Sequence, residues 1–168
     1  MLAEPGTAVQ FIGEKGYGKT THLLAIRARF PESGYEHIDE GERGEVPVGD
    51  PVMIDEAQRL TWWQRHRLFR SRVPLVLGTH KDFTRELVKA GRQVRTVAVA
   101  ERMNPERLTR ILNARIEWVR RDDGGVPAVP FDIAAGLFER FGPDIRTIQY
   151  ELYKTFQKMT ARTSDVEV

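Results

Sequence analysis

Near the start of the chain, glycines, a lysine and a threonine follow one another at a spacing that can bind phosphate. Residues 13–20 read GEKGYGKT and match the pattern G-x-x-x-x-G-K-[ST]. Glycines allow a curled backbone whose successive N–H groups point at phosphate oxygens. Lys19 would then contact the β and γ phosphates, and the Thr20 hydroxyl would bind magnesium. The pattern predicts a site for a nucleoside triphosphate with magnesium, and the alternative is a glycine turn without a ligand.

Polar residues follow two later apolar segments. Asp55 and Glu56 come directly after the run 51–54, and Thr79 and His80 follow the run 73–77 after one glycine. Ligands of open α/β sheets gather at the carboxyl ends of the strands. We therefore expect Asp55 in the magnesium shell, Glu56 orienting the attacking water, and Thr79 or His80 near the γ-phosphate or that water. The alternative for each pair is a strand-end turn whose side chains are simply solvated or hydrogen-bonded.

The hydrophobic pattern places these residues on alternating strands and helices. Strand-like runs occupy 8–12, 35–38, 51–54, 73–77 and 94–99, helical patterns occupy 19–29, 61–69 and 83–90, and 39–49 is expected to be a loop. In the first helix, Leu23, Leu24 and Ile26 are expected to face the core. This alternation predicts a three-layer α/β fold with a mostly parallel sheet. The glycine-rich segment then lies between a strand and a helix, whose positive N-terminal end favours an anion.

From residue 104 onward the pattern is only helical. Asn104 and Pro105 are typical of a helix start, as N-cap and first-turn residue. Apolar spacing predicts two further helices at 133–141 and 145–159, separated by a Gly-Pro pair. We expect a core at 1–101, a small C-terminal helical subdomain at 102–160 and a flexible tail at 161–168.

The composition narrows the class of protein. With 168 residues, the chain has room for one compact α/β domain and a small appendage. It contains no cysteine, which excludes disulfides, thiolate metal sites and cysteine nucleophiles. No stretch approaches the ~20 apolar residues needed to span a bilayer, and no secretory signal is visible at the start. We expect a cytoplasmic protein without a membrane partner. The net charge of +2 is too small to indicate nucleic-acid binding by itself.

With these residues placed, the chain resembles the AAA+ branch of the P-loop ATPases over about residues 9–159. Residues 13–20 match its Walker A motif, residues 52–56 match Walker B with its catalytic glutamate, and Thr79 or His80 falls at the sensor-1 position. The segment 142–146 is similar to the start of the last lid helix in initiator-like members. This makes Arg146 the sensor-2 candidate, and the alternative is a surface arginine near a helix start.

The resemblance implies ATP as the nucleotide, with magnesium as cofactor and hydrolysis as the reaction. Its catalytic residues would be Glu56 and Lys19, and its metal residues Thr20 and Asp55. The nucleotide-binding residues it implies are Gly13, Glu14, Lys15, Gly16, Tyr17, Gly18, Lys19, Thr20, Thr21 and Arg146.

The chain also departs from this family. The spacing between Thr20 and Asp55 is short, so an outer strand is expected to be trimmed or irregular. The sensor-1 asparagine is missing. Arg92 and Arg95 lie where an arginine finger would lie, and the alternative is that both are ordinary solvated arginines. Ring assembly and efficient turnover are therefore open, because a finger supplied in trans can carry a factor of roughly a thousand or more in rate.

A basic and aromatic stretch follows the acidic pair. Residues 59–72 contain two adjacent tryptophans and several arginines, with no acidic residue. Arg65, Arg67 and Arg70 could contact phosphates while Trp62 or Trp63 stacks on bases. The alternative, which the pattern favours, is an amphipathic helix that packs Leu60, Trp63, Leu68 and Phe69 on the core and leaves its arginines solvated.

These observations together predict a small magnesium-dependent ATPase whose nucleotide state moves a helical lid and changes the grip on a macromolecular partner. Nucleic acid is the first expectation for that partner, and a protein or a second copy of the chain is the alternative. Two other functions remain open: a nucleotide or small-molecule kinase, and a nucleotide-binding adaptor that does not hydrolyse. No motif distinguishes ATP from GTP.

Overall fold

The computed structural model describes residues 4–121 and 127–164. Its contacts divide the chain into two units. The sheet unit comprises residues up to 14 and residues 18–99, and the helical unit comprises residues 15–17 and those from 100 onward. Within the described ranges, no helix has the length and apolar character needed to cross a membrane.

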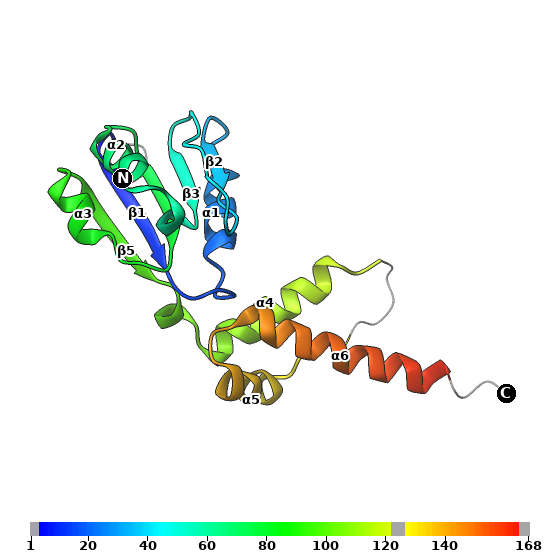
Figure 1. Cartoon of the computed structure of the whole chain (residues 1–168). Helices are drawn as coiled ribbons and strands as arrows, with labels where there is room; N and C mark the ends of the chain where they lie inside the picture. Colours follow the sequence, from blue (N-terminus) through cyan, green and yellow to red (C-terminus); the bar gives the residue numbers. More distant parts are fainter. Residues whose placement is uncertain (1–3, 122–126, 165–168) are drawn as a thin grey trace. The chain divides into compact units, whose positions relative to one another are not determined.

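The sheet unit is built on five parallel strands (Figure 1). They are β1 (Thr7–Ile12), β2 (Gly34–His37), β3 (Val52–Asp55), β4 (Leu75–Thr79) and β5 (Gln93–Ala98), in the spatial order β2-β3-β4-β1-β5. Every neighbouring pair is parallel, which confirms the α/β class and makes the sheet fully parallel rather than mostly so. The edge strand β2 has only four residues. Because parallel strands share a direction, the ends of β1, β3 and β4 lie along one edge.

Helices cover both faces of this sheet. Along β1, Val9 and Phe11 face α1 (Lys19–Arg27), where the rings of Phe11 and His22 lie 5.0 Å apart. Leu23, Leu24 and Ile26 of α1 were expected to face the core. Leu23 is fully buried, but Leu24 is 45% exposed, so the expectation was wrong for Leu24. A nine-residue helix lying on a sheet buries one narrow stripe, and two consecutive residues point about 100° apart.

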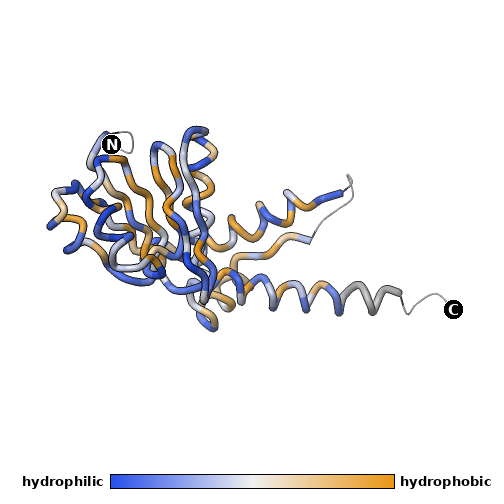
Figure 2. Tube along the Cα trace, turned by 45° about the horizontal axis from the view of Figure 1, so that its top comes forward, coloured by the Kyte–Doolittle hydropathy of each residue, from blue (hydrophilic) through white to orange (hydrophobic). Residues whose placement is uncertain are grey.

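The opposite face carries the short 3-10 helix η1 (Ala57–Arg59), α2 (Trp62–Arg70) and α3 (Thr84–Lys89). Thr61 caps α2: its hydroxyl accepts from the backbone of Gln64, whose side chain accepts from the backbone of Thr61. Figure 2 shows the apolar character of the strands that lie between these layers. The core on this side comprises Ala8, Ile38, Val52, Ile54, Ala57, Leu60, Leu68, Phe69, Leu75, Leu77, Phe83 and Leu87.

The helical unit contains η2 (Ala100–Arg102), α4 (Pro105–Trp118), α5 (Phe131–Phe141) and α6 (Ile145–Ser164). As predicted, the Asn104 side chain caps α4, accepting from the backbone N–H of Arg107 at 2.8 Å. The hydrophobic core of the helical unit comprises Leu108, Leu112, Val129, Ala134 and Ile148. Helix α6 continues to Ser164, which includes the first residues of the predicted tail at 161–168, and residues 165–168 lie outside the described ranges.

Candidate functional site

The glycine-rich segment connects β1 to α1 through a tightly curved backbone. Gly16 and Gly18 both have φ of 93°, a conformation that strains any residue with a Cβ atom. The N–H of Gly13 donates to the carbonyl of Thr79 at 3.2 Å, which ties the start of the loop to the end of β4. Gly16 and Gly18 therefore have a backbone conformation that favours glycine at both residues.

Lys19, the first residue of α1, turns back over this loop. Its ammonium donates to the carbonyls of Gly13 at 2.8 Å and Glu14 at 3.1 Å, and lies 3.6 Å from Oε1 of Glu56. The residue is 4% exposed. Burial lowers the pKa of Lys19, against the opposing effect of the Glu56 and Asp55 carboxylates. A desolvated ammonium held by backbone carbonyls gains from any anion that enters the loop.

Thr20 and Asp55 meet beside the lysine although they lie 35 residues apart. The Thr20 hydroxyl donates to Oδ2 of Asp55 at 2.5 Å. Asp55 is fully buried, and its Oδ1 accepts from the backbone N–H of Glu56 at 3.1 Å. Gly78 on the neighbouring strand leaves room for this carboxylate, since a Cβ atom there would overlap Oδ1 of Asp55.

Glu56 stands at the end of β3 in a left-handed conformation with φ of 62°. Its Oε2 accepts from Nε2 of Gln58 at 2.7 Å and lies 3.3 Å from Nε2 of His80. Burial by itself would raise the pKa of Glu56, but the Gln58 hydrogen bond and the charges of Lys19, His80 and Arg59 outweigh it, and the pKa is lowered. Glu56 is thus ionised at neutral pH. A left-handed conformation costs a non-glycine residue about 1–2 kcal/mol, and such strain clusters at functional sites.

The structure separates the two residues that follow β4. His80 reaches the site: its Nε2 lies 3.2 Å from the Lys19 ammonium and its Nδ1 lies 3.3 Å from Oε2 of Glu14. The hydroxyl of Thr79 is fully buried elsewhere, where it accepts from the backbone N–H of Lys81 and donates to that residue's carbonyl, both at 3.0 Å. Of the two sensor candidates, His80 is the one that contacts Lys19 and Glu56.

Two further residues of the site were not predicted from the sequence. Gln58 joins the ends of β3 and β4, since it donates to Glu56 and accepts from the backbone N–H of His80 at 3.2 Å. Nδ1 of His37, at the end of β2, lies 3.1 Å from Oδ2 of Asp55. The signal for His37 was its place near the end of a strand-like run of the same parallel sheet. The sequence signal for Gln58 was limited to its nearness to the acidic pair Asp55 and Glu56.

The other predicted nucleotide-binding residues differ in exposure. Lys15 and Thr21 are exposed, and Tyr17 is partly exposed. Arg146 is an exposed residue in the first turn of α6, in the helical unit.

Arg92 is neither an arginine finger nor a solvated arginine. It is 5% exposed, and its guanidinium donates to the carbonyls of Thr7, Leu68, Phe69, Ser71 and Val73 and to the Ser71 hydroxyl. Burial lowers the pKa of Arg92 to about 10, so it stays charged at neutral pH. Arg92 therefore clamps β1, the end of α2 and the lead into β4, and cannot reach a neighbouring molecule. Arg95, on β5, is exposed.

The basic and aromatic stretch also differs from its predicted packing. Leu60, Leu68 and Phe69 are buried as expected, but Trp63 is 74% exposed and does not pack on the core. Arg65 is bound within the fold: its guanidinium donates to the carbonyl of Leu60 at 2.6 Å, and its charge lies over the Phe83 ring. Arg65 is thus a structural residue rather than a free contact for phosphate. Arg67 and Arg70 are exposed.

No protein-family model matches this chain, and no curated protein matches it significantly. Any functional assignment therefore rests on the cluster of Lys19, Thr20, Asp55, Glu56 and His80.

Proposed function

We propose that this chain binds a purine nucleoside triphosphate with magnesium, with ATP as the first choice, and hydrolyses it at the carboxyl edge of the sheet. The observation that carries the proposal is the convergence of the curled loop with Lys19 and Glu56 (3.6 Å apart) and with Thr20 and Asp55 (2.5 Å apart). Lys19 and Thr20 begin α1, whereas Asp55 ends β3 and Glu56 follows it. In the sequence, the strand β2 lies between α1 and β3. A glycine turn without a ligand has no need for a buried ammonium or for two acids beside it.

The loop and Lys19 would bind the phosphates. In the structure the ammonium donates to the carbonyls of Gly13 and Glu14. A phosphate oxygen is a stronger partner than a neutral carbonyl for a desolvated cation, because it adds the attraction of an opposite charge, which is poorly screened at a buried site. Entry of a triphosphate would therefore turn Lys19 from the loop carbonyls toward the ligand.

The residues present also fit a magnesium ion. Magnesium prefers oxygen ligands and is usually held by one or two protein groups together with substrate phosphates and water. The hydroxyl of Thr20 and the carboxylate of Asp55 are oxygen donors that already contact each other. When bound there, magnesium would neutralise charge on the β and γ phosphates. His37 would stay beside Asp55 and fix the orientation of its carboxylate.

Glu56 would orient the attacking water. Its lowered pKa keeps it ionised, which suits an acceptor that aligns and polarises water more than a strong base that removes a proton early. Gln58 holds one carboxylate oxygen, and His80 lies between Glu56 and Lys19. A shift of Lys19 toward phosphate would therefore change the partners of both His80 and Glu56. In this way the γ-phosphate would be sensed at the end of β4. By the resemblance to the AAA+ ATPases, the nucleotide state would also move the helical unit and alter the grip on a partner.

The hydrolytic step is tested by phosphate release from ATP and from GTP with magnesium, comparing wild type with Glu56→Gln. The substitution keeps the shape of the side chain and its ability to accept from Gln58, but removes the charge. We expect the variant to bind nucleotide and to release phosphate at least 100-fold more slowly, in the range of a lost catalytic base. Equal and slow rates for both proteins would leave a nucleotide-binding adaptor as the function. Transfer of phosphate to a small acceptor rather than to water would identify a kinase.

A further inference from the structure

Helix α2 presents aromatic rings to solvent where the sequence pattern predicted core packing. Trp62 is 56% exposed and Trp63 is 74% exposed. The ring of Trp62 stacks on His66 at 5.0 Å with an interplanar angle of 24°, and meets Trp63 edge-on at 4.6 Å. Large rings left at the surface of a short helix lose the hydrophobic stabilisation that burial would give them. Rings exposed in this way are available to contact a ligand.

The same helix is cationic and carries no acidic residue. Arg67 and Arg70 are exposed on it, one turn apart, and Lys89 is exposed near the end of α3. Arg67 also lies one turn after Trp63, so cations and rings alternate along the helix. We call Trp62, Trp63, His66, Arg67, Arg70 and Lys89 the α2 surface.

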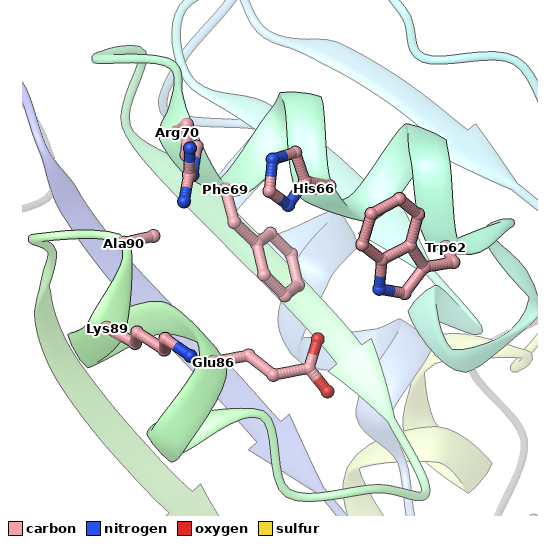
Figure 3. Close-up of a pocket in the computed structure, with 7 residues that line it drawn as sticks. All are labelled: Trp62, His66, Phe69, Arg70, Glu86, Lys89 and Ala90. Carbon is pink, nitrogen blue, oxygen red and sulfur yellow. The ribbon is translucent and has the colours of Figure 1, made fainter.

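A pocket of about 280 Å³ opens within this surface, between α2 and α3. Its lining comprises Trp62, His66, Phe69, Arg70, Glu86, Lys89 and Ala90. Figure 3 shows the α2 side chains opposite Glu86 and Lys89 of α3, with Phe69 between the helices. Glu86 is the acid of the pocket, and its carboxylate lies 3.7 Å from Nε of the structural Arg65, which offsets its charge. The lining is thus mainly aromatic and cationic, with Ala90 as its aliphatic side chain and Glu86 as its acid.

We propose that the α2 surface binds single-stranded nucleic acid. Bases stack on Trp62 and Trp63, and backbone phosphates pair with Arg67, Arg70 and Lys89. Aromatic faces accept bases only when these are unpaired, so the substrate is single-stranded rather than duplex. Rings that alternate with cations match a ligand that is flat and anionic, which favours nucleic acid over a protein partner. The inference does not depend on the proposed nucleotide site, because the α2 surface and the phosphate loop use different residues.

The test is fluorescence anisotropy of a labelled oligothymidylate with the full chain, in the absence of nucleotide, over a range of salt concentrations. Three phosphate contacts predict a slope of log affinity against log salt of about −2, which is a loss of about 100-fold for a tenfold rise in salt. Trp62→Ala should weaken binding about fivefold or more, while Trp62→Phe, which keeps a ring, should weaken it less. Arg70→Glu should weaken binding and reduce the slope.

Arg29→Glu is the matched control, since Arg29 is exposed just after α1, on the opposite face of the sheet, and the substitution changes the charge equally. Circular dichroism verifies that each variant is folded. The proposal is overturned if wild type does not bind at low salt, or if Arg29→Glu weakens binding as much as Arg70→Glu does. It is also overturned if duplex of the same length or polyglutamate competes as well as the single strand. The polyglutamate result would mean that the surface takes an acidic polypeptide.

Discussion

Replacing Glu56 by glycine and, separately, by alanine isolates the backbone strain at this residue from the contacts of its side chain. Both substitutions remove the carboxylate that accepts from Gln58 and lies beside Lys19 and His80. Both therefore lose the same side-chain interactions. They differ only in whether a Cβ atom occupies a residue with φ of 62°.

The difference in stability between the two variants follows from two opposing effects. The left-handed conformation costs a residue with a Cβ about 1–2 kcal/mol, which the alanine variant retains. Glycine avoids this cost but gives the unfolded chain more freedom, which costs about 0.5–1 kcal/mol. The glycine variant should therefore be more stable than the alanine variant by about 1 kcal/mol or slightly less. In a chain of this size that is about 2–4 °C in melting temperature.

Urea and thermal unfolding followed by circular dichroism measure this difference. Ala25→Gly is the control, because Ala25 is exposed in the middle of α1, where glycine should be less stable than alanine by about 1 kcal/mol. The order of glycine and alanine is thus expected to reverse between residues 25 and 56. Phosphate release should be equally low in both Glu56 variants. If Glu56→Ala is more stable than Glu56→Gly, the backbone at residue 56 is not strained.

Three further predictions concern the clamp, the pH dependence and the sensor. Arg92→Ala should lower the free energy of unfolding by about 3 kcal/mol or more, because several buried carbonyls lose their hydrogen-bond donor. Arg95→Ala should change it by less than about 0.5 kcal/mol. Similar small losses for both variants in urea unfolding would contradict the structural role of Arg92. The pKa of Glu56 is lowered, so this carboxyl binds a proton less readily in the folded state than in the unfolded state. The ionised Glu56 therefore stabilises the fold above its ordinary pKa of 4.5, and this stabilisation is lost as the pH falls through its pKa in the folded state. The advantage of wild type over Glu56→Gln in urea midpoint should therefore shrink on acidification, and a gap that grows would show the sign to be wrong. His80→Ala should slow phosphate release about tenfold or more with little loss of stability. Thr79→Val should mainly destabilise the turn before Lys81. The reverse pattern would make Thr79 the sensor.

The fold was predictable because its periodicity is strong. Buried strands such as β3 and β4 are continuous apolar runs, as a parallel sheet covered on both faces requires. The N-cap at Asn104 followed from local chemistry alone. The candidate site was predictable for a related reason: a parallel sheet brings the ends of its strands to one edge, so residues that follow different strands meet there.

What the sequence could not show depends on tertiary packing. Helical periodicity marked Trp63 as a core residue, but α2 buries a stripe through Leu68 and Phe69 that excludes it. Arg92 resembled a surface arginine because nothing local reveals the five carbonyls that converge on it. Thr79 and His80 were equivalent in sequence, but the Thr79 hydroxyl bonds to the backbone of Lys81, and it is His80, just after β4, that lies beside Lys19.

Calorimetric titration of ATP and GTP with magnesium into wild type and Lys19→Ala shows whether the loop binds nucleoside triphosphate. We expect saturable binding to wild type with a stoichiometry of one. Lys19→Ala should weaken binding about 10- to 100-fold, because a charged hydrogen-bond donor is removed. If the folded wild type does not bind, or if the variant binds equally well, the loop is not a nucleotide site.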